Sequence, residues 1–409
     1  MRLVFFGSGA FACPALKALA DRRHEIAGVF TRPDKPAGRG CGITATPVKR
    51  LAREYRLPVY QPDNPNDQAT VELLHWLSPD VGVVVAYGHL LSARLFSQPR
   101  HGILNVHASL LPAFRGAAPV PHAILAGEDR AGATVFRIND RFDEGDVFGA
   151  VEIPIGPADT AVDVLRGLAP LGARLLEEIL GQLEGGWLRP APQSAGQASR
   201  APKFLKSDGH IDWRLCPACI DRMVRGLRPW PLAFTLLPTI RRVQPRAVKP
   251  RDLENIPPEH RGRALRIEAE RRARKAKPPE IIWLRTNILE VEPIPDIDGD
   301  EGPPPPPAPW ELRAQRLVPA IRGKDDAPTL THRLREAVAA AERRWPAPPT
   351  LAGEAPPGLI LRADPEHGIV VRCGGGSVRL LRLQPENRCA MTSAEFLRGA
   401  SVKSLMRTR

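Results

Sequence analysis

The sequence predicts an α/β domain followed by a second, smaller and mostly β domain. Over residues 1–150, short apolar runs alternate with helical patterns, which is typical of βαβ units and a parallel sheet. After Asp208, strand-like runs predominate. A stretch at about 251–355 includes five consecutive prolines, Pro303–Pro307, which favour polyproline II over a folded core. The fold class is therefore α/β, with a β domain that a Pro-rich insertion interrupts.

The elements of the first part follow in order along the chain. Apolar runs predict strands at Leu3–Phe6, Ile26–Thr31, Val81–Ala86, Ile103–His107 and Thr134–Ile138. Helical patterns predict helices over Ala12–Ala20, Pro47–Tyr55 and Ala161–Leu183. Residues 32–46 are rich in Pro and Gly and predict a loop. We expect this domain to cover residues 1–187, with a linker over 188–206.

The second part, residues 207–409, predicts a small β-barrel. A helix is expected at Cys216–Leu227. Strands are expected at Leu232–Leu237, Thr239–Val243, Leu359–Arg362, Ile369–Arg372 and Val378–Leu383. The poorly ordered insertion at about 251–355 would separate the second of these strands from the third.

Charge divides the chain into two unlike halves. Residues 1–200 contain 21 Lys and Arg against 20 Asp and Glu, whereas residues 201–409 contain 37 against 25. A neutral half joined to a basic half indicates chemistry in one and a polyanionic partner for the other. Sparse cysteine and the absence of a targeting segment or of a long apolar run favour a cytoplasmic protein without a membrane span.

The segment Asn105-Val106-His107 ends a predicted strand and is the first candidate for chemistry. Residues two apart in a strand project from the same face, so both side chains would enter the crevice beyond the strand. A carboxamide can donate hydrogen bonds to an oxyanion, and an imidazole can stabilise the same charge or move a proton. A carboxylate from the segment Asp140–Asp146 could orient that imidazole.

Several motifs, taken in order, resemble the folate-dependent formyltransferases. They are Gly7–Ala12, Val85–Gly88, Asn105–His107, Ser109–Pro112, Arg115–Pro119 and Asp143–Asp146. Within this family the methionyl-tRNA formyltransferase branch fits best, because the loop Arg32–Gly40, the segment Ile211–Trp213 and the segment Arg228–Pro231 also resemble it. The resemblance implies a Rossmann-like catalytic domain and an OB-like β-barrel, over about residues 1–250 and 356–400.

The resemblance also implies a reaction and its site. The formyl donor would be 10-formyltetrahydrofolate, and the acceptor the α-amino group of methionyl initiator tRNA. Asn105, His107 and Asp143 would be catalytic, with no metal. Folate would lie against Val85, Ala86, Tyr87, Gly88, Ser109, Leu110, Leu111 and Pro112. Candidate tRNA contacts are Arg39, Lys203, Lys206, Arg241 and Arg242, although Cys41–Ile43 departs from the basic pattern that the family has there.

Other functions compete with this interpretation. The chain could formylate a small amine, such as a sugar nucleotide or glycinamide ribonucleotide, or it could be a non-catalytic RNA-binding relative. Gly7-x-Gly9-x-x-Ala12 is similar to a dinucleotide-binding motif, but no acidic residue follows at the position that would bind the ribose. Cys216 and Cys219 have the spacing of metal ligands but no second pair, which favours a structural role. Nothing predicts an obligate interface, so we expect a monomer.

Overall fold

The computed structural model describes two units of the chain. The described residues are 1–22, 24–37, 42–241, 280–295, 357–358, 360–364, 366, 368–386 and 388–399. The first unit contains Met1–Gly209 and Arg225–Pro231. The second contains His210–Val224 and the strands that come later in the chain. Among the described residues, no helix has the length and apolarity needed to cross a membrane.

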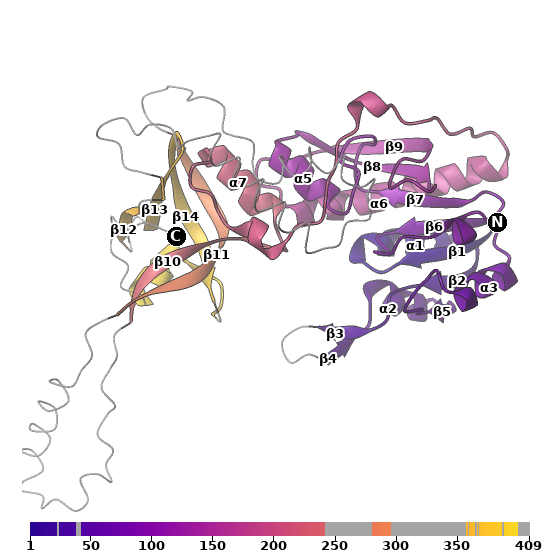
Figure 1. The fold of residues 1–409 in the computed structure, drawn as a ribbon, viewed down its shortest axis with the longest axis horizontal. Helices are drawn as coiled ribbons and strands as arrows, with labels where there is room; N and C mark the ends of the chain where they lie inside the picture. The colour runs from indigo at the N-terminus through magenta and orange to yellow at the C-terminus, as the bar shows by residue number, and fades with distance from the viewer. Residues whose placement is uncertain are drawn as a thin grey trace, which may run out of the picture. The chain divides into compact units, whose positions relative to one another are not determined.

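A seven-stranded sheet organises the first unit (Figure 1). Its strands are β1 (Arg2–Gly7), β2 (Glu25–Phe30), β5 (Val59–Tyr60), β6 (Val81–Val85), β7 (Ile103–His107), β8 (Arg130–Arg137) and β9 (Val147–Pro154). They pair in the order β5-β2-β1-β6-β7-β8-β9. A two-stranded hairpin, β3 (Lys35–Ala37) with β4 (Gly42–Thr44), lies in the segment predicted as a loop.

The prediction of a parallel sheet is confirmed for β1, β2, β6 and β7 and wrong for β8, and the sheet also contains β5 and β9, which the sequence did not predict. Neighbours from β5 to β7 run parallel, whereas β8 and β9 are antiparallel to their neighbours. Strand β9 alternates half-buried and exposed residues over much of its length. An antiparallel strand needs no crossover helix and tolerates water on one face, so it can close the edge of a parallel sheet.

Six helices accompany this sheet: α1 (Cys13–Asp21), α2 (Pro47–Glu54), α3 (Gln68–Leu77), α4 (Ala93–Phe96), α5 (Pro119–Ala126) and α6 (Ala161–Glu184). Their starts follow local capping. Thr46 caps α2 by accepting from the backbone N–H of Lys49, and Asp67 caps α3 in the same way. Thr160 and Asp163 form a capping box at the start of α6.

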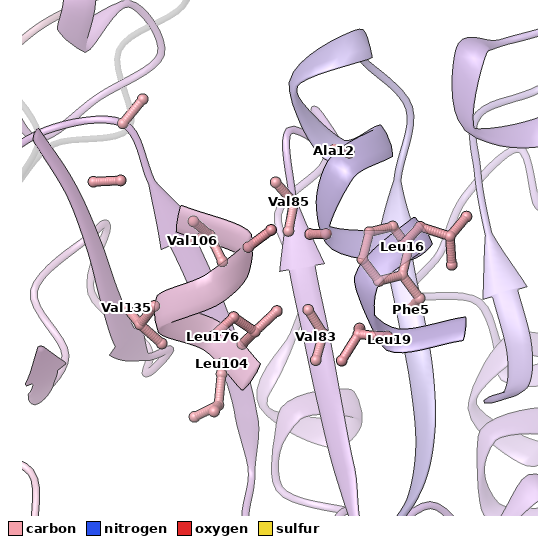
Figure 2. Packing of buried hydrophobic residues seen from close by; sticks show 14 of the residues in the cluster. Phe5, Ala12, Leu16, Leu19, Val83, Val85, Leu104, Val106, Val135 and Leu176 are labelled. Atoms are coloured by element: carbon pink, nitrogen blue, oxygen red, sulfur yellow. The ribbon is translucent and has the colours of Figure 1, made fainter. Parts of the chain in front are cut away.

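Apolar side chains cover both faces of the sheet. Phe5 of β1 lies in one core with Leu16 of α1 and Leu176 of α6, as Figure 2 shows. The next residue, Phe6, lies in the other core with Leu74 of α3. Successive residues of a strand point to opposite faces, so an unbroken apolar run fills both cores at once.

The order of the strands determines where a site can form. The chain passes from β1 outward to β2, then returns to place β6 on the other side of β1. Parallel sheets bind their ligands beyond the carboxyl ends of strands at such a reversal. The segments after β6 and β7 begin at that edge, directly after Val85 and His107.

The second unit is an antiparallel sheet that curves as a half-barrel (Figure 1). Its strands are β10 (Ala233–Arg241), β11 (Glu280–Pro295), β12 (Ile360–Asp364), β13 (Gly368–Cys373), β14 (Gly376–Pro385) and β15 (Met391–Thr392). They pair in the order β10-β11-β14-β13-β12, and β15 pairs with β14. Helix α7 (Pro217–Gly226) precedes the strands and helix α11 (Ser393–Gly399) follows them.

Two predictions for this unit are wrong. Leu232–Leu237 and Thr239–Val243 were expected as two strands, but β10 continues through Pro238. Proline lacks an N–H group, and β10 ends the pairing order of the described strands, where the missing donor costs little.

The insertion predicted at about 251–355 is also not continuous, because residues 280–295 form β11 between β10 and β14. The pairing register of β11 shifts on both sides of Glu290, so the period-two pattern of a strand is broken within it. The remaining residues of that stretch lie outside the described part of the chain.

Candidate active site

Strand β7 places Asn105 and His107 on one face of the sheet. Leu104 and Val106 enter the core that contains α6, so the alternate residues face the opposite way. Asn105 is half-buried, and its carboxamide has no hydrogen-bond partner among the residues that the structure describes. The two side chains therefore project from the same face of β7, as their spacing predicted, and their catalytic role stays a prediction.

His107 has a polar partner at each ring nitrogen. The side chain is buried, 7% exposed. Its Nε2 lies 3.1 Å from the carbonyl oxygen of Phe114, and its Nδ1 lies 3.7 Å from Oδ2 of Asp143. The loop between β8 and β9 therefore brings to the ring the carboxylate that the resemblance implied. Protonated, the ring could donate to the carbonyl and bear a charge that the carboxylate offsets.

Asp143 is nearly enclosed, and this changes its acidity. Burial raises the pKa of its carboxyl group above the ordinary value, while His107, the Gly116 N–H and two arginines oppose the rise. The Gly116 N–H donates to Oδ2 of Asp143 over 2.9 Å. A carboxyl group that holds its proton more readily than usual can take part in proton transfer beside an imidazole.

Four polar side chains support this loop, and sequence reasoning assigned none of them a role. Arg115 and Arg200 both contact Oε1 of Glu144, at 3.2 and 3.1 Å. Gln193 bridges Arg115 to the backbone of Asp143 and Gly145. Arg115 and Glu144 lie within motifs that the sequence analysis quoted, whereas Gln193 lies in the predicted linker, where nothing in the local pattern distinguishes it.

The turn after β6 holds the first group of predicted folate contacts, residues 85–88. Ala86 and Gly88 have positive φ, 46° and 83°, and the carbonyl of Ala86 accepts from the N–H groups of Ser8 and Gly9. Tyr87 is 1% exposed and packs edge-on against Phe6. Burial raises the pKa of the Tyr87 hydroxyl to about 12. The side chain of Tyr87 thus serves packing, and the backbone of this turn is the part open to a ligand.

The second predicted group, residues 109–112, follows β7. Ser109 donates to the carbonyl of Ala113 over 2.7 Å, and Thr134 donates to the carbonyl of Ser109. The same threonine accepts from the Leu111 N–H, and the Leu111–Pro112 peptide is cis. The Thr134 side chain of β8 therefore holds both ends of this segment. Because β6 and β7 are neighbours in the sheet, the two predicted groups follow adjacent strands.

The structure describes three of the five predicted tRNA contacts. Lys203 and Lys206 are exposed and belong to the first unit, the one that contains the catalytic candidates. Arg241 ends β10, where it pairs with Glu280 through the backbone. Arg39 and Arg242 lie outside the described residues.

The two cysteines with metal-ligand spacing lie at the start of α7. Their sulfur atoms are 2.7 Å apart, and burial is the largest cause that raises the pKa of the Cys219 thiol to about 12. Over the described ranges, no group of three or more His, Cys, Asp or Glu side chains is arranged to hold a metal ion.

Comparison with known proteins identifies the family. Residues 1–180 match the family described as "Formyl transferase", and residues 310–401 match "Formyl transferase, C-terminal domain". Methionyl-tRNA formyltransferase of Frankia alni is 47% identical over 237 residues, which cover 58% of this chain and 72% of the relative. The same enzyme of Alkaliphilus oremlandii is 40% identical over 235 residues, 58% of this chain and 76% of the relative.

A solved structure of HypX from Aquifex aeolicus, in complex with tetrahydrofolic acid, has a similar fold. The TM-score is 0.51 at 13% identity, and the match covers 97% of this chain and 47% of that one. At this identity the likeness concerns the fold alone. The sequence matches show that the chain belongs to the methionyl-tRNA formyltransferase branch of the formyl transferase family.

Proposed function

We propose that this protein transfers the formyl group of 10-formyltetrahydrofolate to the α-amino group of methionyl initiator tRNA, in translation initiation. The observation that carries the proposal is the grouping of Asn105, His107 and Asp143 at the end of β7, in a chain of this family. Among the described residues the Asn105 carboxamide has no hydrogen-bond partner, and the imidazole of His107 lies beside a buried carboxylate.

In the proposed reaction the α-amino nitrogen attacks the formyl carbon. A bond forms between nitrogen and carbon, and the formyl oxygen becomes an oxyanion. Asn105 donates a hydrogen bond to this oxyanion, and the positive charge of a protonated His107 stabilises it. The bond between the formyl carbon and N10 then breaks, and the proton released by the amine reaches N10. Asp143 stabilises the charge on His107 and assists this proton transfer.

The donor would be held by backbone groups more than by side chains. The turn at residues 85–88 adopts positive φ and is tied to the turn after β1, so its N–H and carbonyl groups have fixed directions. Segment 109–112 is fixed by Thr134 in the same way. Rigid backbone donors and acceptors can match the amide-like edge of a pterin ring without side-chain reorganisation.

The acceptor would be held by charge. The net charge of +12 over residues 201–409 suits phosphate contacts that depend on salt and not on sequence. Arg39, Lys203, Lys206, Arg241 and Arg242 are the proposed contacts. We further propose a cytoplasmic monomer, and light scattering of the purified protein with and without tRNA tests the oligomeric state.

The direct test is formyl transfer from 10-formyltetrahydrofolate to methionine charged on initiator tRNA. Free methionine and a methionyl elongator tRNA are the controls. We expect rapid formylation of the initiator species and little of either control. Formylation of a small amine such as a sugar nucleotide, with none of methionyl-tRNA, would instead indicate the small-amine function. RNA binding without any transfer would indicate a non-catalytic relative.

A further inference from the structure

The segment before the second unit is attached to the candidate active site along its length. Ala191 and Val147 exchange two backbone hydrogen bonds, of 2.8 and 2.9 Å. Further along, the Arg115 N–H donates to the carbonyl of Ser199, and the Ala201 N–H donates to the carbonyl of Arg115. Residues 191–201, which we call the strap, therefore join the β8–β9 loop region to the segment after β7.

Gln193 is the residue of the strap that reaches the catalytic loop. Its Oε1 accepts from Nε and Nη2 of Arg115, at 3.1 and 2.8 Å. Its Nε2 donates to the carbonyl oxygens of Asp143 and Gly145, at 3.0 and 2.8 Å. A carboxamide has two donors and accepts at two lone pairs, so this one is fully used. The opposite amide orientation would set donor against donor and acceptor against acceptor.

The two carbonyl groups that accept from Gln193 belong to a loop whose backbone is tightly constrained. Asp143 has a φ of 54°, in the left-handed region, which is uncommon outside glycine although aspartate adopts it more often than most residues. A Cβ atom on Gly145 would lie 1.6 Å from the carbonyl oxygen of Arg137, so the chain passes close to β8 there. A strained backbone of this kind persists only where its surroundings hold it.

The position of this loop determines the contact between Asp143 and His107. Oδ2 of Asp143 lies 3.7 Å from Nδ1 of His107, which is slightly beyond hydrogen-bond distance. A small displacement of the loop would either close this gap or open it. The Gly116 N–H, which donates to the same oxygen, holds the carboxylate from the other side.

We propose that Gln193 is a positioning residue, which acts from the strap to set the place of Asp143 beside His107. This inference rests on the proposed function, since it concerns the same reaction. Gln193 does not itself contact the reacting groups. Its effect passes through the backbone of the Asp143–Gly145 loop, with Arg115 fixing the amide orientation.

The first test compares Gln193→Met with the wild-type protein. Methionine is close to glutamine in volume but makes none of the four hydrogen bonds. We expect kcat to fall about 10-fold to 100-fold, the cost of a small misplacement of a catalytic group, while KM for both substrates stays unchanged. Gln193→Glu keeps the acceptor for Arg115 but turns a carboxylate oxygen toward two carbonyls, and it should lose at least as much.

The matched control is Gln197→Met, a change of the same type at an exposed position of the same strap. It should leave kcat and KM as in the wild-type protein. Thermal unfolding of each variant shows whether a loss reflects misfolding. A Gln193→Met protein that is folded and turns over at the wild-type rate would overturn the proposal.

A second test asks whether the effect passes through Asp143. In an Asp143→Asn background, Gln193→Met should cause little further loss of kcat, because residues that act as a unit are not additive. A loss as large in this background as in the wild-type protein would show that Gln193 acts by another route.

Hydrogen exchange of the Gly116 amide provides a readout that does not need activity. This N–H donates to the Asp143 carboxylate, so displacement of the loop in Gln193→Met should speed its exchange about 10-fold. Unchanged exchange would contradict the proposal. If the wild-type protein transfers no formyl group to methionyl-tRNA, the proposed function fails, and this measurement still decides whether Gln193 holds Asp143.

Discussion

The two units of this chain differ in the number of residues on which their proposed roles depend. In the first, the candidate chemistry depends on a few side chains whose places are set by hydrogen bonds across long stretches of sequence. In the second, the described strands form an antiparallel sheet, and the half of the sequence that contains them has a net charge of +12. Bond-making requires fixed atoms, whereas attraction to phosphates sums over many charges. Single substitutions should therefore abolish the first activity and only weaken the second.

The largest difference between the effects on formyl transfer and on RNA binding should come from His107 and Asn105. Replacing His107 or Asn105 by alanine removes a group that stabilises the oxyanion, so kcat/KM for formyl transfer should fall about 1,000-fold. RNA affinity, measured by filter binding at low salt, should not change. A parallel loss of RNA affinity would mean that these residues support binding or the fold, and that the two tasks are not separate.

Asp143→Asn should lower kcat about 100-fold while it stabilises the protein at neutral pH. Burial raises the pKa of Asp143, so the native state binds its proton more tightly than the unfolded chain. The free energy of unfolding of the wild-type protein therefore falls as the pH rises from the ordinary aspartate pKa through the raised pKa. It stays lower at every pH above the raised pKa.

The asparagine of Asp143→Asn does not titrate, so the variant does not lose this free energy of unfolding as the pH rises. Urea unfolding of both proteins should favour the variant at neutral pH, and the difference should vanish at about pH 3, where the wild-type carboxyl is also neutral. A variant less stable than the wild type at neutral pH would mean that the Asp143 charge is well compensated by His107 and the nearby arginines.

Gly116→Ala tests the close contact between the strap and the catalytic segment. The glycine has a φ of 140°, and a Cβ atom there would lie 2.2 Å from the carbonyl oxygen of Ala201. We expect a loss of about 2 kcal/mol in the free energy of unfolding, with reduced kcat. Gly181→Ala in α6 is the control: its Cβ would meet nothing within 4 Å, and it should gain about 0.5–1 kcal/mol.

The smallest effects should come from the lysines at the end of the first unit. Lys203→Ala and Lys206→Ala should each reduce the slope of log affinity for tRNA against log salt by about one, and leave kcat unchanged. Lys17→Ala, whose side chain pairs with Asp21 at 2.6 Å, is the control and should change neither. Salt slopes equal to that of the wild type would place the phosphate contacts elsewhere.

Parts of the fold with a strong local pattern could be predicted from the sequence. The apolar run Ile103–His107 marks both ends of β7, and the spacing of Asn105 and His107 places them on one face. The helical pattern at Ala161–Leu183 agrees with α6 to one residue. The sequence did not predict β11, because its residues lie within the stretch that the prolines at 303–307 marked as an insertion.

The sequence by itself determined which residue types stand at the ends of the strands, because strand and helix periods are properties of neighbouring residues. It also determined the family, through motifs that keep their order along the chain. Only the tertiary structure decided the position of Asp143. That position depends on Gln193, Arg115 and Gly116, which lie 27 to 50 residues from the loop that they hold. Contacts over such separations produce no periodic pattern in the sequence. The sequence therefore predicted a linker where the structure has the strap.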